Sequence, residues 1–235
     1  MKILGVDSSG MVAGVAVVED DILLAEYTLN YKKTHSETLL PMIDEVVRMT
    51  ELEMEAIDAI AVAAGPGSFT GLRIGSATVK GLGLALNKSI IEIPTCLGLA
   101  YNVWGTDALV CPIMDARRKQ VYTGIYEYRG DELVTVSEQK AIDICELVEE
   151  LNTMNRKVIF VGDGIPVYKE LINENAEFEY TFAPAHCNRQ RAAAIAALGV
   201  IYASKEMMVS ADMHKPIYLR KSQAEREREE KMANE

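Results

Sequence analysis

Residues 59–75 read AIAVAAGPGSFTGLRIG and place a short apolar run, a turn and the start of a helix one after another. The apolar run at 59–64 is bounded by turn residues, which predicts a buried strand. The Gly-Pro-Gly-Ser sequence at 65–68 predicts a turn, and a helix is expected over 69–87 with Asn87 as its C-terminal cap. A buried strand that leads directly into a helix is typical of α/β proteins.

The strands around this segment predict a mixed sheet. Apolar stretches at 2–7, 12–18 and 22–29 are joined by short turns, which favours antiparallel hairpins. The strands at 59–64 and 89–93 are separated by a long helical segment, which favours parallel pairing. We therefore expect an α/β fold.

After Pro94 the sequence predicts a second α/β layer. Its strands are expected at 109–114, 121–128, 157–161 and 179–182, and its helices at 96–103, 143–151 and 167–173. An alanine-rich helix at about 189–205 is expected to close this layer, and residues 216–220 are expected to be extended. We interpret the charged tail after Arg220 as a solvated or frayed helix rather than a nucleic-acid arm.

A first helix is expected to begin near Thr34. Thr34 and Glu37 have the spacing of a capping box, in which both side chains satisfy free backbone N–H groups. The apolar residues that follow recur at helical spacing: Leu39, Leu40, Ile43, Val46 and Val47. Pro41 removes one backbone hydrogen bond, so the helix is expected to kink or restart there.

The composition indicates a folded, acidic chain. Of the 235 residues, 24 are Lys or Arg and 35 are Asp or Glu, which gives a net charge of −11. Such a chain repels phosphate backbones unless its basic residues are clustered, which disfavours stand-alone nucleic-acid binding. No apolar run is long enough to span a bilayer, and Asp7 interrupts the first one, so we expect a cytosolic protein without a signal peptide.

Histidine and cysteine spacing does not favour a metal site. The four cysteines contain no CxxC pair and are expected to be mostly buried thiols. The histidines at 35, 186 and 214 show no H-x-x-H, H-x-x-x-H or HExxH spacing. We therefore expect no metal held by this chain alone. We also expect no catalytic residue, because neighbours such as His35 and Ser36 point in different directions on a helix.

Small residues form a stripe along the helix predicted at 69–87. Gly71, Gly75, Thr78, Gly81 and Ala85 recur at steps of three or four. Each interior glycine costs about 1 kcal/mol relative to alanine, so we expect close backbone contacts to offset the cost. The approaching neighbour is either this domain's own sheet or first helix, or a second protein chain, and the spacing favours neither.

Two turns have the composition of a phosphate site. Asp7 and Ser8, after the first strand, are candidates for contacts to a magnesium-bound phosphate, and Gly67 precedes a helix N-terminus that favours anions. An Asx-type turn explains the Asp7 segment at least as well. The segment at 65–71 lacks the G-x-x-x-x-G-K-[ST] pattern, which disfavours a P-loop ATPase.

Several of these segments together resemble the TsaB (YeaZ) family. The glycine segment at 61–75 is the most specific, and it is joined by ILGVDSS at 3–9, HSETLLP at 35–41, DAR at 115–117, GDG at 162–164 and PIYLR at 216–220. The resemblance implies an actin-like ATPase (ASKHA, RNase H-like) fold with two α/β subdomains. It places the N-terminal subdomain at 1–104, the C-terminal subdomain at 105–221 and a charged tail at 222–235, in a bacterial cytoplasmic protein.

The resemblance implies a non-catalytic role in tRNA modification. In this family the paralogue TsaD holds the metal and transfers the threonylcarbamoyl group to adenosine 37 of tRNAs that read codons beginning with A. TsaC makes the adenylate donor, and the ATPase TsaE joins the complex. The paralogue's two metal-binding histidines correspond to Thr95 and Leu99 here, and leucine offers no lone pair to a cation. ATP and metal are therefore expected in the partner subunits, and tRNA is expected to bind only within the complex.

The resemblance further implies that the first and second helices pair with TsaD, or with a second copy of the chain in isolated protein. The residues expected at this seam are His35, Leu39, Leu40, Ile43, Arg73, Gly75, Thr78 and Leu82. We expect Gly75→Leu to abolish pairing and leave the monomer folded.

Other functions are weighed against this one. The main alternative is an independent ASKHA-type ATPase or phosphotransferase that uses Asp7 and the turn at 65–71. The histidine spacing disfavours a metalloprotease. The acidic charge disfavours an independent tRNA-binding module, although the basic turn at 117–119 or the tail is available to touch RNA beside a partner.

Overall fold

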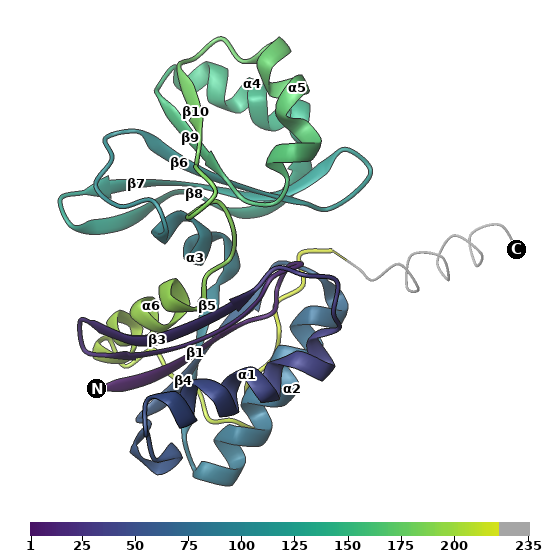
Figure 1. Cartoon of the computed structure of the whole chain (residues 1–235). Coiled ribbons are helices and arrows are strands. Elements are labelled where there is room, and N and C mark those ends of the chain that lie inside the picture. The colour runs from purple at the N-terminus through teal and green to yellow at the C-terminus, as the bar shows by residue number, and fades with distance from the viewer. Residues whose placement is uncertain (221–235) are drawn as a thin grey trace, which may run out of the picture.

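The computed structural model describes residues 1–220 and consists of two α/β subdomains (Figure 1). The first contains a five-stranded sheet in the order β3-β2-β1-β4-β5, and the second a five-stranded sheet in the order β10-β9-β6-β7-β8. Both sheets have parallel and antiparallel neighbours, which confirms the predicted α/β class with mixed sheets. The helix predicted in the charged tail lies outside the described residues. No helix among residues 1–220 is both long and apolar enough to cross a membrane.

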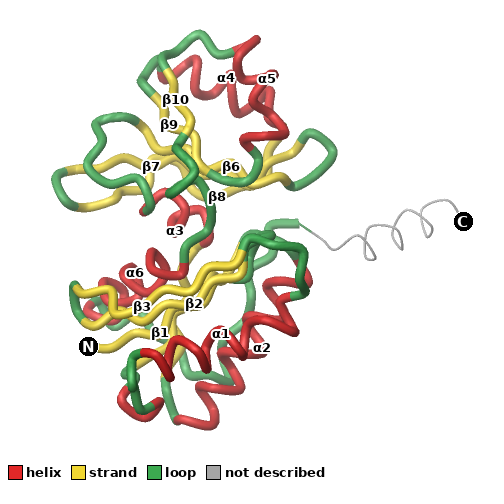
Figure 2. The backbone as a smooth tube through the Cα atoms, in the orientation of Figure 1, coloured by secondary structure: helices red, strands yellow, loops and turns green. Residues whose placement is uncertain are grey.

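The first sheet has the predicted arrangement. Its antiparallel strands are β1 (Lys2–Asp7), β2 (Ala13–Glu19) and β3 (Ile22–Leu29), and its parallel additions are β4 (Ala59–Gly65) and β5 (Ser89–Pro94). The helices α1 (His35–Met49) and α2 (Phe69–Leu86) lie side by side on one face, and α6 (Ala192–Ser204) lies on the other (Figure 2). A short 3-10 helix at Met54–Ala56 precedes β4. Every residue of β4 is buried, as expected for a strand covered on both faces.

The two helices α1 and α2 differ at their ends. Ser68 Oγ accepts a hydrogen bond from the Gly71 N–H, and Asn87 ends α2 in the left-handed conformation, as predicted. The predicted capping box of α1 is wrong, because within the described chain the Thr34 hydroxyl caps no N–H group and accepts a bond from the Ser36 hydroxyl instead. The helix continues through Pro41, so it does not restart there.

The second subdomain contains one strand that the sequence analysis missed. Its elements are β6 (Leu109–Asp115), β7 (Gln120–Arg129), β8 (Glu132–Asp143), α4 (Ile144–Met154), β9 (Val158–Val161), α5 (Ile165–Asn175) and β10 (Tyr180–Phe182). The helices α4 and α5 pack on one face of this sheet, and α3 (Thr95–Tyr101) contacts β6 and β7. The missed strand β8 has no fully buried residue, so its sequence carries little of the apolar alternation that predicts a strand.

The alanine-rich helix α6 belongs to the first subdomain, so the prediction that it closes the second layer is wrong. It packs against β1, β2, β4 and β5. The contact is close because both sides are small: a Cβ at Gly5 would lie 2.7 Å from Ala196 Cβ, and one at Gly199 would lie 2.8 Å from Ala61 Cβ. The first subdomain is therefore completed by residues from the C-terminal half of the chain.

Residues 205–220 form a strap that returns along the first subdomain and ends at the second. Val209 pairs with Ile90 of β5, and the Ile217 N–H donates to the Ala64 carbonyl at 2.7 Å. The Arg220 guanidinium then donates to the Ala116 carbonyl of the second subdomain at 2.8 Å. The strap thus bridges the two subdomains.

Gly5→Ala is expected to destabilise the first subdomain. The new Cβ would overlap with α6, and overpacking of this kind costs about 1–3 kcal/mol. Gly81→Ala is the matched control, since a Cβ there would have no described atom within 4 Å and alanine favours a helix by about 1 kcal/mol. Urea unfolding should show a lower free energy of unfolding for Gly5→Ala and a higher one for Gly81→Ala. Equal stability of the two variants would contradict the packing of α6 on β1.

Candidate functional site

The connection between β1 and β2 is an Asx turn. The Asp7 carboxylate is buried, and it accepts hydrogen bonds from the Ser9 N–H at 2.9 Å and from the Ser9 hydroxyl at 2.6 Å. An aspartate that bonds to the backbone two residues on holds a tight turn. The structure thus has the Asx turn that was one of the two interpretations of this segment, and the Ser9 amide is occupied.

This turn rests on the N-terminal end of α2. The Ser8 hydroxyl donates to the Gly71 carbonyl at 2.9 Å, and the Ser68 N–H donates to the Ser9 carbonyl at 2.7 Å. A Cβ at Gly67 would lie 2.3 Å from the Ser9 carbonyl oxygen, and one at Gly71 would lie 2.1 Å from that of Ser8. Glycine is therefore required at both positions. We call this contact between residues 8–9 and residues 67–71 the hairpin seat.

Gly75 also faces the hairpin, which corrects its predicted place at a partner seam. A Cβ at Gly75 would lie 2.3 Å from Ser8 Oγ, so leucine there would collide with the chain's own turn. Because a side chain there would displace the Ser8 hydroxyl from the Gly71 carbonyl, we expect Gly75→Leu to perturb the monomer itself as well as any pairing. Farther along α2, a Cβ at Gly81 would have no described atom within 4 Å. The small residues at the start of α2 therefore contact the hairpin, whereas the space beside Gly81 is open among the described residues.

The predicted seam residues of α1 divide into buried and exposed ones. Leu39 and Ile43 are 1% and 4% exposed and lie in the core between α1 and the sheet, so their predicted place on a partner surface is wrong. Leu40 is 56% exposed. His35 is half-buried, and its Nε2 lies 2.8 Å from the Gly10 carbonyl oxygen. Helical spacing identifies the apolar side of a helix but not which of its residues lie at the edge.

On α2 several exposed apolar residues lie outside the predicted seam, although Gly81 belongs to the predicted small-residue stripe. Leu84 is 63% exposed, and Ala77 and Gly81 are also exposed. The sequence feature that could have identified them is their spacing of four and three residues, which places them on one side of the helix. We define the outer helix face as Leu40, Ala77, Gly81 and Leu84.

The remaining predicted residues of α2 have mixed surroundings. Thr78 and Leu82 are half-buried. Arg73 is exposed but engaged within the chain: its Nε donates to the Tyr218 hydroxyl at 3.3 Å, and its guanidinium lies 6.0 Å from the Phe69 ring centroid. The Phe69 and Tyr218 rings stack at 4.7 Å. The start of α2 is therefore tied to the C-terminal strap.

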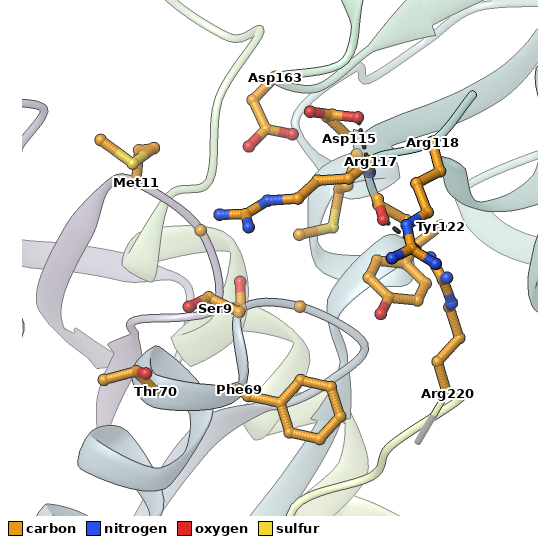
Figure 3. Close-up of a pocket in the computed structure, with 15 residues that line it drawn as sticks. Ser9, Met11, Phe69, Thr70, Asp115, Arg117, Arg118, Tyr122, Asp163 and Arg220 are labelled. Carbon is orange, nitrogen blue, oxygen red and sulfur yellow. Dashed lines mark hydrogen bonds between the residues drawn. The ribbon is translucent and has the colours of Figure 1, made fainter. Parts of the chain in front are cut away.

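A cleft of about 640 Å³ lies between the two subdomains (Figure 3). It is lined by Ser9, Gly10, Met11, Gly67, Ser68, Phe69 and Thr70 from the first subdomain, by Met114, Asp115, Ala116, Arg117, Arg118, Tyr122 and Asp163 from the second, and by Arg220 from the strap. Of the three predicted cofactor residues, this described lining includes Gly67 but neither Asp7 nor Ser8. The structure therefore does not bring the three together at the cleft surface.

Two acidic groups near the cleft have perturbed pKa values. Burial raises the pKa of Asp7 to about 6, although its bonds from Ser9 act in the opposite direction. Burial also raises the pKa of Asp163, whose Oδ1 has no hydrogen-bond partner among residues 1–220. Nowhere in that same range do three His, Cys, Asp or Glu side chains gather in an arrangement able to hold a metal ion.

Comparison with known proteins identifies the family. The family model described as "TsaD: tRNA N6-adenosine threonylcarbamoyltransferase" matches residues 22–228. The Bacillus subtilis protein named tRNA threonylcarbamoyladenosine biosynthesis protein TsaB is 34% identical over 227 residues, which cover 96% of each chain. The chain belongs to the TsaB (YeaZ) family. The Escherichia coli protein of the same name is 28% identical over 74% of this chain and 77% of its own length.

Solved structures agree with the fold of this TsaB-family chain. YeaZ from Pseudomonas aeruginosa superimposes with a TM-score of 0.79 at 24% identity, covering 93% of this chain and 99% of that one. Component A of the (R)-2-hydroxyglutaryl-CoA dehydratase of Acidaminococcus fermentans superimposes with a TM-score of 0.51 at 11% identity, covering 87% and 99%. These likenesses concern the fold alone, and with them the predicted actin-like ATPase fold is confirmed.

Thr95 and Leu99 have structural roles in this TsaB-family chain. The resemblance aligns these two positions with metal ligands of the paralogue. Thr95 is 1% exposed, and its hydroxyl accepts a hydrogen bond from the Gly65 N–H at 3.2 Å. Leu99, one helical turn later, is 1% exposed in the hydrophobic core. A metal ligand must present a lone pair, and here one position is bonded to the backbone and the other is a hydrocarbon.

Asp7→Asn is expected to stabilise the TsaB-family chain above pH 6. Because burial disfavours the ionised carboxylate, the folded chain binds this proton more tightly than the unfolded chain does. Wild-type stability is therefore lost as pH rises from about 4, the unfolded pKa, to about 6, the folded one. Asparagine keeps the acceptor for Ser9 without the charge. Unfolding free energies should show an advantage for the variant that grows to about 2–3 kcal/mol across this range. An advantage that shrinks with rising pH would contradict the assignment.

Proposed function

We propose that this chain is the non-catalytic partner of a TsaD-type threonylcarbamoyltransferase. In this proposal the pair forms N6-threonylcarbamoyladenosine at position 37 of tRNAs that read codons beginning with A. The names of the relatives support the pathway, and the match to a TsaD family model supports a related partner. The chain's own contribution is to associate through α1 and α2 and so to stabilise the catalytic subunit in its active arrangement.

The outer helix face carries this proposal. Leu40 and Leu84 are more than half exposed, and Gly81 leaves the backbone of α2 open to close approach. Helices that present small residues allow another helix to pack near the backbone, where dispersion contacts are numerous. Large exposed apolar side chains beside such an opening are typical of a protein–protein interface. This apolar surface is therefore better suited to packing against helices of a partner than to exposure to water.

The surroundings of Thr95 and Leu99 support a non-catalytic role. Acyl transfer assisted by a metal requires ligands that orient and polarise the donor. The two positions that the resemblance assigns to such ligands are a bonded hydroxyl and a core leucine. The proposal accordingly places the metal and ATP in the partner subunits and the ATPase TsaE in a larger complex. It places tRNA only in the assembled complex, a homodimer in isolated protein, and the whole assembly in the cytoplasm.

Leu40→Asp and Gly81→Leu are each expected to abolish association with the TsaD partner. The aspartate would bury a charge in the interface, and the leucine would hold the partner helix away. Both positions are open in the isolated chain, so the variants should unfold at denaturant concentrations close to wild type. Co-elution from a sizing column measures the association.

Val167→Asp on α5 is the matched control, because Val167 is 58% exposed and lies in the second subdomain. It should co-elute with the partner as wild type does. Unchanged co-elution of both Leu40→Asp and Gly81→Leu would refute pairing through the outer helix face.

Omitting each protein in turn from a tRNA modification assay is expected to show that both subunits are needed and that this chain alone transfers nothing. Metal analysis of the purified chain should find less than one ion per chain, because Leu99 has no lone pair and the Thr95 hydroxyl already accepts a hydrogen bond. Saturable ATP turnover by the isolated chain, lost on Asp7→Ala, would favour the alternative ATPase or phosphotransferase function instead.

A further inference from the structure

The turn between β6 and β7 carries three consecutive basic residues in an uncommon conformation. Arg117, Arg118 and Lys119 have φ values of 63°, 56° and 60°, all in the left-handed region. The turn is fixed by its neighbours: the Arg117 N–H donates to Asp115 Oδ1 at 2.9 Å, and the Ile144 N–H donates to the Lys119 carbonyl at 2.9 Å. The three side chains therefore project from a rigid base.

These three side chains are exposed cations that have no counterion among the described residues. They are all exposed, and within residues 1–220 none of them makes a hydrogen bond or an ion pair. Elsewhere in the second subdomain, Arg129 and Arg156 both pair with Glu127. A rigid cluster of unpaired positive charge on a chain with a net charge of −11 is a local anion-binding surface.

A fourth cation joins them at the edge of the cleft. Arg220 lines the cleft and donates to the Ala116 carbonyl in the same turn. Figure 3 shows Arg117 extending from the turn toward the hairpin that carries Ser9 and Met11. Ser68 and Thr70 line the cleft from the first subdomain, where the Ser68 hydroxyl also accepts a hydrogen bond from the Gly71 N–H. Guanidinium groups with nearby hydroxyls are the side chains that bind phosphate oxygens.

The interior of the cleft is less suited to phosphate than its edge. Asp115 and Asp163 both line it, and their carboxylates repel an anion. At Ser9 the hairpin backbone is already bonded, since its N–H donates to Asp7 and its carbonyl accepts from Ser68. The charges thus favour phosphates that pass along the outside of the turn, as those of a polynucleotide do, over the phosphate tail of a nucleotide inserted into the cleft.

We propose that Arg117, Arg118, Lys119 and Arg220 form a contact site for the backbone phosphates of the tRNA substrate when this chain is paired with its catalytic partner. The inference rests on the proposed function, which supplies the RNA. The four residues would position the tRNA and would not take part in the chemistry, since none of them lies at reacting atoms. The acidic remainder of the chain keeps the isolated subunit from binding RNA, and the partner supplies the rest of the surface.

The test measures tRNA binding to the complex of this chain with its TsaD partner by fluorescence anisotropy over a series of salt concentrations. Arg117→Gln/Arg118→Gln should weaken binding at low salt. The slope of log affinity against log salt should fall in magnitude by about 0.7–0.9 for each lost phosphate contact. Arg117→Lys/Arg118→Lys keeps both charges and should retain the wild-type slope.

Arg156→Gln/Lys169→Gln is the matched control, because it removes two positive charges from another part of the second subdomain and should leave the slope unchanged. Equal slopes for the turn variant and this control would overturn the inference. A second result would also overturn the inference. If the turn variant kept the wild-type slope for tRNA but lost ATP binding as an isolated chain, the cations would belong to a site for a free nucleotide.

The sizing column separates this inference from the proposed function. If the turn variant co-elutes with the partner and binds tRNA with the wild-type slope, the RNA contact is refuted and the proposed function stands. If the wild-type chain does not co-elute with the partner at all, the proposed function and the inference that rests on it are both overturned.

Discussion

The contact on which the rest of the structure depends is the hairpin seat, where the turn after β1 presses on the start of α2. Two hydrogen bonds hold it, the hairpin backbone leaves no room for a Cβ at Gly67 or Gly71, and a Cβ at Gly75 would displace the Ser8 hydroxyl. The seat fixes α2, and with it the outer helix face. Within the same turn the Asp7 carboxylate also occupies the Ser9 amide, so that N–H group is not free to bind a phosphate.

Local chemistry made much of the fold predictable. The apolar runs of β1 to β5 and the Asn87 cap were read correctly, because strand burial and helix termination are decided by neighbouring residues. The missed strand β8 is half-exposed and polar, so it is specified by pairing with β7 rather than by its own pattern. The misplaced helix α6 is apolar on all sides, and its close contacts with distant residues such as Gly5 and Ala61 decide which sheet it covers.

The candidate site was less predictable, because surfaces are set by tertiary contacts. Leu39 and Leu40 are adjacent apolar residues on one helix, yet the first lies in the core and the second is exposed. The spacing of Gly75 and Gly81 could not show that one meets Ser8 and the other meets open space. The basic turn was visible as a sequence, but that it has no carboxylate partner among residues 1–220 emerges only from the positions of the surrounding side chains.

The outer helix face and the basic turn are connected through the C-terminal strap. Arg73 of α2 lies over the stacked rings of Phe69 and Tyr218, and two residues later Arg220 bonds to the turn. An exposed cation–π contact is worth about 0.5–1 kcal/mol, so the Arg73 contact adds modestly to the Ile217–Ala64 backbone hydrogen bond that holds the strap. The strap therefore contacts both the start of α2, the helix that carries most of the proposed partner surface, and the basic turn.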